Sequence, residues 1–165
     1  MIVLYILVGL IIVGADQWIK QWAVENLISE SGAHLSKEFI KLGDTRIIDL
    51  TYTENTGAAF GSLDGMKVFL IGLPILIAIL GIVTMSRFNE KSKFFSWCVL
   101  AVISGGVSNL IDRIRIGYVV DYIEIKLFDF AIFNFADCCV CVGVALMLIY
   151  VLFINKDLFE TKRGA

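Results

Sequence analysis

Four long segments of the chain are almost purely apolar, and polar stretches separate them. A helix that crosses the hydrocarbon core of a bilayer needs about 20 mostly apolar residues. The pattern therefore predicts four membrane-spanning helices, at about residues 1–22, 68–86, 94–114 and 133–154. We expect residues 1–165 to form a single integral membrane domain of the all-α class.

Two of the polar stretches have a different pattern. The first covers about residues 23–67, and within it residues 45–53 alternate and are rich in β-branched side chains. The second, about residues 115–132, contains the sequence Tyr118–Ile123 with the same character. Alternation and β-branched side chains are typical of strands. We therefore expect short strands in both stretches.

Composition also favours a lipid environment. The chain is 58% hydrophobic and 18% charged, with a mean hydropathy of +0.83, whereas soluble domains are about 45–50% apolar and about 25% charged. The net charge of −2 shows no basic excess, so we expect no nucleic-acid partner. The four cysteines fall inside apolar runs and the only histidine, His34, lies in a polar stretch. We expect small buried thiols, no metal site and no cofactor.

Basic residues predict the orientation in the membrane. Arg87, Lys91 and Lys93 lie together between the second and third helices, and further basic residues follow the fourth. Lys and Arg are enriched in cytoplasmic loops. Both termini are therefore expected inside, and residues 23–67 and 115–132 outside.

Polar residues that interrupt the apolar runs gather at the outer ends of the helices. They are Asp16 and Lys20 in the first helix, Asn109, Asp112 and Arg113 in the third, Asp121 in the stretch that follows, and Asn134 and Asp137 at the start of the fourth. A charge at membrane depth costs about 2.5–3.5 kcal/mol, so such groups usually face a partner or a watery cavity. We expect one polar cluster near the outer leaflet.

Several members of this cluster have simple structural interpretations. Asp16 and Lys20 are four residues apart, so they are expected to form an ion pair that fixes the end of a helix. Asp112 and Arg113 are consistent with an ordinary helix-end pair. Asp137 is harder to explain in this way, because it is the only charge in a long apolar span.

Small residues suggest where helices approach one another closely. Ala101, Gly105, Asn109 and Arg113 recur every four residues and therefore share one face of the third helix. The pair Gly105–Gly106 is most simply explained by close helix packing.

Asp121 and Asp137 suggest a chemistry if they meet. Two carboxylates within hydrogen-bonding reach share one proton, and the pair can then act as general base and general acid in peptide hydrolysis. His34 lies outside the cluster, which disfavours nucleophiles that depend on histidine. A serine–lysine dyad of Lys20 with Ser104 or Ser108 remains conceivable.

The chain resembles the prolipoprotein signal peptidases, or signal peptidase II, over nearly its whole length. The similar segments, in the order of the family, are Asp16–Lys20, Glu54–Gly61, Gly105–Arg113, Gly117–Ile123 and Phe133–Asp137. One departure is visible: Ser108 stands where the family usually has glycine directly before the asparagine of the third segment. Because serine is also small, we expect slightly altered packing without loss of activity.

The resemblance implies a role for each residue of the cluster. Asp121 and Asp137 correspond to the catalytic aspartyl dyad. Asn55 and Gly57 correspond to a motif beside the substrate, and Asp16 and Lys20 to the motif at the end of the first helix. The polar shell that positions the dyad and the substrate corresponds to Asn109, Asp112, Arg113 and Asn134.

The resemblance also implies an activity and its setting. Such enzymes carry an extracytoplasmic β-sheet cradle, lie in the bacterial cytoplasmic membrane among its lipids, and act near the outer leaflet. They cut prolipoproteins directly before a cysteine that carries a diacylglyceryl group, and cyclic peptides such as globomycin inhibit them. We expect a monomer.

Two other functions must be weighed. A proton-coupled transporter or channel subunit would use Asp137 and Asp112 as a relay, but it predicts charges staggered across the membrane, whereas these gather at one level. A subunit for assembly or anchoring, without activity, leaves the asparagines of the cluster unexplained.

Overall fold

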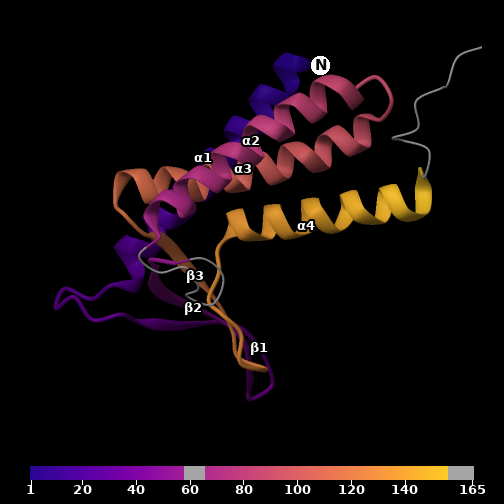
Figure 1. The fold of residues 1–165 in the computed structure, drawn as a ribbon. Coiled ribbons are helices and arrows are strands. Elements are labelled where there is room, and N and C mark those ends of the chain that lie inside the picture. Colours follow the sequence, from indigo (N-terminus) through magenta and orange to yellow (C-terminus); the bar gives the residue numbers. More distant parts are fainter. Residues whose placement is uncertain (58–65, 156–165) are drawn as a thin grey trace, which may run out of the picture.

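The computed structural model describes residues 1–57 and 66–155, and its helices form a membrane-type bundle (Figure 1). The helices are α1 (Ile2–Leu27), α2 (Lys67–Phe88), α3 (Lys93–Arg115) and α4 (Phe135–Ile149), which a π-helix, η2 (Tyr150–Ile154), continues. Four helices in the described part of the chain are long and apolar enough to cross a membrane. The predicted fold class is confirmed.

Helix α1 is longer than the sequence predicted. It was expected to end near residue 22, but it continues to Leu27. Ala23 and Leu27 are fully buried against the strands, so tertiary packing holds this last turn in the helix. Residues 23–27 are therefore helical and do not begin the outer connection.

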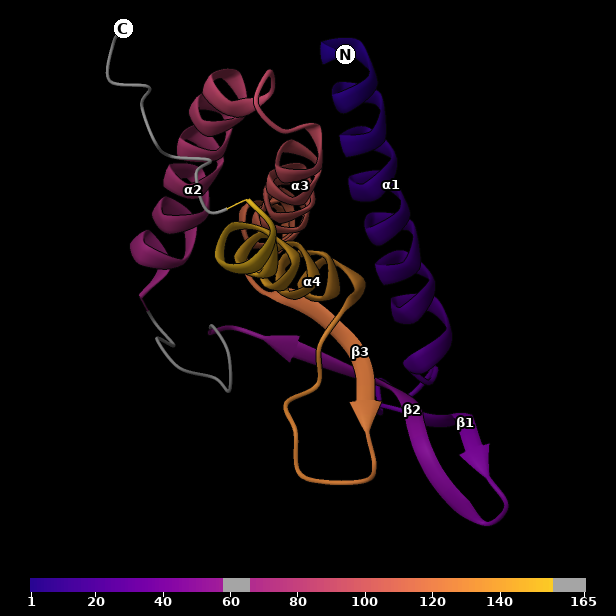
Figure 2. The ribbon, with the colours of Figure 1, turned by 90° about the vertical axis from the view of Figure 1, so that its right-hand side faces the viewer.

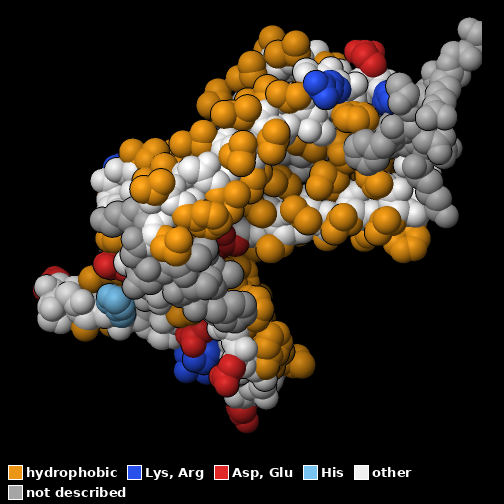
Figure 3. Space-filling model, in the orientation of Figure 1, with side chains coloured by type: hydrophobic (Ala, Val, Ile, Leu, Met, Phe, Trp, Pro, Cys, Tyr) orange, Lys and Arg blue, Asp and Glu red, His pale blue; other side chains and the backbone are white. Residues whose placement is uncertain are grey.

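Helix α3 forms the centre of the bundle. It packs against α1, α2 and α4 (Figure 2). In its apolar stretch of 18 residues, 56% is buried inside the protein, compared with 11% or less in the corresponding stretches of the other three helices. The other helices therefore keep most of their apolar surface on the outside, as Figure 3 shows. This pattern is expected where lipid, and not water, is the solvent.

Close contact between α3 and α4 depends on two glycines. A Cβ atom at Gly105 would lie 2.4 Å from the carbonyl oxygen of Ala136, and one at Gly143 would lie 2.9 Å from that of Cys98. The packing role expected for Gly105 is confirmed. The same expectation for Gly106 is wrong, because no atom from another element lies within 4 Å of a Cβ placed there.

A three-stranded antiparallel sheet stands at one end of the bundle. Its strands are β1 (Ser36–Leu42), β2 (Thr45–Asn55) and β3 (Val119–Ile125), in the order β1-β2-β3. Gly43, with φ of 60°, forms the turn between β1 and β2, where most side chains would be strained. In β2 and β3, Thr53 pairs with Asp121, which places Asp121 beside the end of β2.

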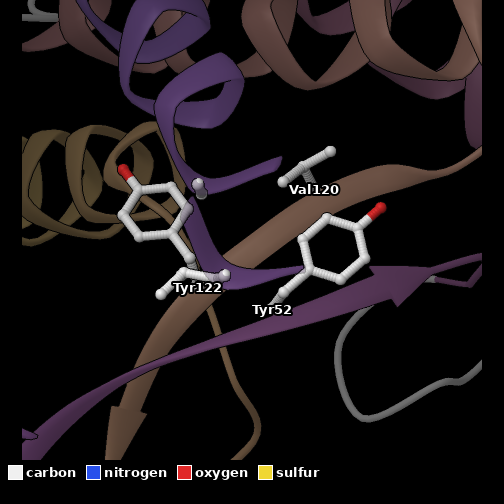
Figure 4. Packing of buried hydrophobic residues seen from close by; sticks show 5 residues of the cluster. Tyr52, Val120 and Tyr122 are labelled. Carbon is white, nitrogen blue, oxygen red and sulfur yellow. The ribbon is translucent and has the colours of Figure 1, made fainter. Parts of the chain in front are cut away.

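A small apolar core attaches the sheet to the helices. It consists of Ala23, Leu27, Tyr52, Val120 and Tyr122 (Figure 4), all at most 3% exposed. The hydroxyl of Tyr122 also accepts a hydrogen bond of 3.2 Å from the backbone N–H of Phe135, the first residue of α4. The core therefore fixes β3 relative to both α1 and α4.

The cysteines are less buried than expected. Cys98 is buried, but Cys138 and Cys139 are only partly buried and Cys141 is exposed on α4. All four thiols are free. The expectation of buried thiols failed because α4 turns much of its surface outward, where apolar runs face lipid and do not pack into a core.

The close contact at Gly105 gives a test of the packing. Gly105→Ala should lower the free energy of unfolding by about 1–3 kcal/mol, because a methyl group must displace the backbone of α4. Thermal unfolding in detergent measures this effect. Gly106→Ala is the matched control and should unfold at nearly the wild-type temperature; equal loss in the two variants would contradict the packing account.

Candidate active site

The structure brings Asp121 and Asp137 into one polar site through the side chain of Asn134. Asn134 Nδ2 donates to Asp121 Oδ1 at 2.6 Å. Asn134 Oδ1 accepts from the backbone N–H of Asp137 at 2.9 Å, and Asp137 Oδ2 accepts from the backbone N–H of Asn134 at 3.1 Å. This reciprocal capping box starts α4. It also fixes the amide of Asn134, so that its NH₂ group faces Asp121.

Asn109 of α3 is oriented in a similar way. Its Oδ1 accepts from Lys20 Nζ at 2.7 Å and from Asn134 Nδ2 at 3.1 Å. Two donors on the oxygen leave the NH₂ group to face Asp137, and Nδ2 donates to Asp137 Oδ1 at 2.7 Å. Each carboxylate therefore receives hydrogen bonds from amides whose orientation is fixed by other contacts.

Asn55 and Gly57 contact the site from the end of β2. Asn55 Nδ2 donates to Asp121 Oδ2 at 2.9 Å, while Asn55 Oδ1 accepts from the backbone N–H of Gly57 at 3.1 Å. The carbonyl oxygen of Gly57 accepts from Arg113 Nη2 at 2.8 Å. A continuous chain of hydrogen bonds thus joins Arg113 on α3 to Asp121 on β3.

The electrostatic environment of Asp121 favours a retained proton. The pKa of this carboxyl is raised to about 6, mainly by burial and also by the nearby charge of Asp137, whereas the hydrogen bonds from Asn55 and Asn134 and the charge of Lys20 lower it. A carboxyl with a pKa near neutrality can give and take protons under physiological conditions.

A buried ion group lies behind these carboxylates. Lys20 Nζ lies 2.8 Å from Asp16 Oδ2 and 2.8 Å from Asp112 Oδ2, and all three side chains are at most 3% exposed. The predicted pair of Asp16 and Lys20 is confirmed. The expected pairing of Asp112 with Arg113 is wrong, because Asp112 binds Lys20 while Arg113 reaches Gly57.

The ion group contacts several elements. Asp16 Oδ1 accepts from the backbone N–H of Ala136 in the first turn of α4 at 2.9 Å, and an anion is favourable at a helix N-terminus. Asp112 Oδ2 accepts from the backbone N–H of Val120 in β3 at 3.3 Å. Lys20, through its two partners, therefore links α1 to the elements that carry Asp121 and Asp137.

No role was predicted for Gln17, but its side chain contacts this ion group. Gln17 Nε2 donates to Asp112 Oδ1 at 2.8 Å and lies 3.1 Å from Ser108 Oγ. Its position directly after Asp16, as an uncharged polar residue near the end of an apolar span, was the available signal.

A serine–lysine dyad is not compatible with these contacts. Lys20 Nζ contacts Asp16, Asp112 and Asn109, so all three of its donor positions are in use. Ser108 is fully buried and donates to Asp16 Oδ2 at 2.7 Å. The proton of Ser108 is therefore directed to Asp16 and not to Lys20, so Lys20 is not placed to activate this serine.

Metal binding finds no support in the described residues. Within residues 1–57 and 66–155, no group of three or more His, Cys, Asp or Glu side chains is arranged to hold a metal ion. The buried carboxylates are bonded to Lys20 and to amide N–H groups.

Known proteins resemble this chain over almost its entire length. The family model described as signal peptidase (SPase) II matches residues 8–153. A lipoprotein signal peptidase of Enterococcus faecalis is 34% identical over 99% of this chain and 97% of its own. Another, from Clostridioides difficile, is 35% identical over 96% of this chain and 98% of its own.

The fold is also known from experiment. A solved structure described as a bacterial membrane enzyme superposes with a TM-score of 0.80 at 29% identity, covering 100% of this chain and 95% of that one. Since the family model spans most of the sequence and the relatives align from end to end, this chain belongs to the signal peptidase II family, the bacterial membrane peptidases that remove signal peptides from prolipoproteins.

Proposed function

We propose that Asp121 and Asp137 are the catalytic dyad with which this aspartic-type signal peptidase cuts prolipoproteins before the lipidated cysteine. The observation that carries this proposal is the shared Asn134, which binds Asp121 through its side chain and caps the helix turn that carries Asp137. Among the described residues, the direct partners of both carboxylates are amide N–H groups and not cations. Neither carboxylate has an ion-pair partner among these described residues, which supports a proton shared between the two.

The dyad requires one proton between its two members. The ionised carboxylate takes a proton from a water molecule, whose oxygen attacks the scissile carbonyl carbon. The protonated carboxyl donates a hydrogen bond to the carbonyl oxygen and stabilises the tetrahedral intermediate. When the C–N bond breaks, the leaving amine of the lipidated cysteine takes the proton that the ionised carboxylate had removed from water, and the dyad again holds one proton. This step needs no metal and forms no covalent intermediate.

Asn55, Asn109 and Asn134 act as positioning residues in this scheme. Each presents N–H donors to a carboxylate while its own oxygen is occupied. Such fixed donors favour the ionised form and so offset the cost of burial. The pair consequently keeps one charge in a site where two would be expensive.

Arg113 has an unused donor that suits a substrate carbonyl. Its Nη2 binds Gly57, but its Nε is buried and has no hydrogen-bond partner among the described residues. An unsatisfied buried donor costs about 1–3 kcal/mol. We assign the guanidinium and the backbone at Gly57 to the substrate's peptide backbone beside the dyad.

The signal helix and the diacylglyceryl group of the substrate are apolar and would lie in the membrane beside the enzyme. The apolar surfaces of α2 and α4 remain exposed on either side of α3 and offer an apolar environment to a signal helix. A diacylglyceryl group holds its cysteine at the membrane surface. This agrees with a dyad at the end of the bundle, where β3 meets the start of α4.

The orientation and the assembly are part of the proposal. The basic residues Arg87, Lys91 and Lys93 lie at the opposite end of the bundle from the sheet, which favours a cytoplasmic location for them and an outer-leaflet site for the dyad, in the bacterial cytoplasmic membrane. A reporter fused after Ala165 should be active only inside the cell, and outside activity would reverse this assignment. We also propose a monomer that globomycin inhibits; light scattering and inhibition assays in detergent test these two points.

The dyad is tested by conservative substitution. Asp121→Asn and Asp137→Asn should each reduce turnover of a lipidated peptide by several orders of magnitude, and the double variant should be hardly worse, because the two groups act as a unit. Binding of the uncleaved peptide should persist, since its acyl chains and signal helix supply most of the contact. Near-normal cleavage by folded Asp137→Asn protein would refute the mechanism.

The pH dependence tests the role of Asn55. Removing its N–H donor in Asn55→Ala should raise the pKa of Asp121 above its value of about 6, because the ionised form loses a hydrogen bond. The basic limb of the kcat profile should then move to higher pH, because Asp121 keeps the proton of the dyad up to a higher pH. A loss of activity with no movement of this limb would show that Asn55 does not act on the dyad.

Arg113→Lys tests the substrate contact. Lysine keeps the charge but lacks the planar fork, so kcat/KM should fall on the order of tenfold, equivalent to ~1.4 kcal/mol. Arg115→Lys, at the end of the same helix, is the control and should behave as wild type. Wild-type kinetics in both variants would remove Arg113 from the site.

A further inference from the structure

Ser108 of α3 lies where three helices meet, directly behind the dyad. Its hydroxyl is fully buried, donates to Asp16 Oδ2 at 2.7 Å and lies 3.1 Å from Gln17 Nε2, which donates to it. Its backbone carbonyl oxygen lies 3.2 Å from the same Gln17 nitrogen. The hydroxyl therefore uses both its donor and an acceptor site, and each bond crosses from α3 to α1.

The contacts of Ser108 lead to the residue next to Asp137. Asp16 Oδ2 is held by Ser108 and Lys20, while Asp16 Oδ1 accepts from the backbone N–H of Ala136. The orientation of the Asp16 carboxylate thus determines how the first turn of α4 is held against α1. Asp137 follows Ala136 in that turn, and its own N–H is capped by Asn134.

We propose that Ser108 is a positioning residue for peptide hydrolysis, because its hydroxyl orients the Asp16 carboxylate that holds the first turn of α4 and thereby places Asp137. The inference rests on the proposed role of Asp137 in the dyad. It also gives a function to the serine that stands where glycine was expected. Glycine could not supply this hydrogen bond, so the serine adds a restraint on the catalytic turn.

Loss of the hydroxyl should disturb the reaction more than the fold. In Ser108→Ala, Asp16 keeps Lys20 and the N–H of Ala136, and Gln17 keeps Asp112. The buried groups therefore remain satisfied and the protein should fold. The carboxylate of Asp16, however, loses one of the donors that fix its rotation, and the catalytic turn becomes less well placed. Small displacements of a reacting group have large effects on rate.

The experiment compares two buried serines of α3. Ser108→Ala in detergent should lower kcat for a lipidated signal-peptide substrate by roughly tenfold with KM unchanged, because binding of the acyl chains and the signal helix does not involve this turn. Ser96→Ala is the matched control, since Ser96 is also fully buried but donates only to the carbonyl oxygen of Ser92 in its own helix segment. It should retain wild-type kcat.

Three results would overturn the proposal: unchanged kcat in Ser108→Ala, a change confined to KM, or an equal loss of kcat in Ser96→Ala. The route through Asp16 has its own test, because Ser108→Ala should have no further effect in an Asp16→Asn background. Additive losses in the double variant would reject this route. Failure of the dyad itself is recognised separately, by cleavage that survives Asp137→Asn.

Discussion

Lys20 is buried between two carboxylates, and the contacts of this ion group reach the elements that carry the proposed catalytic groups. Asp112 bonds the N-terminal part of β3 at Val120, and Asp16 bonds the first turn of α4 at Ala136. A buried ammonium without partners would be very costly, so the group is stable only when α1, α3 and their neighbours are assembled together. The same constraint that satisfies Lys20 therefore brings Asp121 and Asp137 to one place.

Chemistry and stability make opposite demands on this site. In the proposed dyad, Asp121 and Asp137 must retain a titratable proton, and they are bonded to neutral amides, whereas the two carboxylates behind them both contact Lys20. The result is two layers of carboxylates with different environments. The deeper layer joins the helices and β3 through Lys20, and the outer layer is the one to which we assign the exchange of protons. Environment, and not residue type, separates the two roles.

Much of this arrangement follows from the sequence. The four membrane-spanning helices were predicted from long runs of apolar residues, and β2 and β3 from alternating β-branched residues. Both predictions succeed because each pattern depends only on residues close together in the sequence. The end of α1 was missed, since its last turn is held by burial against the sheet. Strand β1 has no distinct pattern because all its residues are exposed. The four-residue spacing predicted the ion pair of Asp16 with Lys20. Asp112, the second ion-pair partner of Lys20, could not be predicted in this way, because that contact joins different helices.

The central claim is that Asp121 and Asp137 share one proton near neutral pH. Infrared spectroscopy of the purified protein measures it directly, because a protonated carboxyl has a C=O stretching band distinct from that of a carboxylate. One protonated-carboxyl band is expected near pH 6; it should weaken as the pH rises, be lost in Asp121→Asn, and titrate at lower pH in Asp137→Asn, where the neighbouring charge is removed. Ser96→Ala should keep the wild-type band. Absence of the band in the wild-type protein, or its survival in both aspartate variants, would contradict the shared proton.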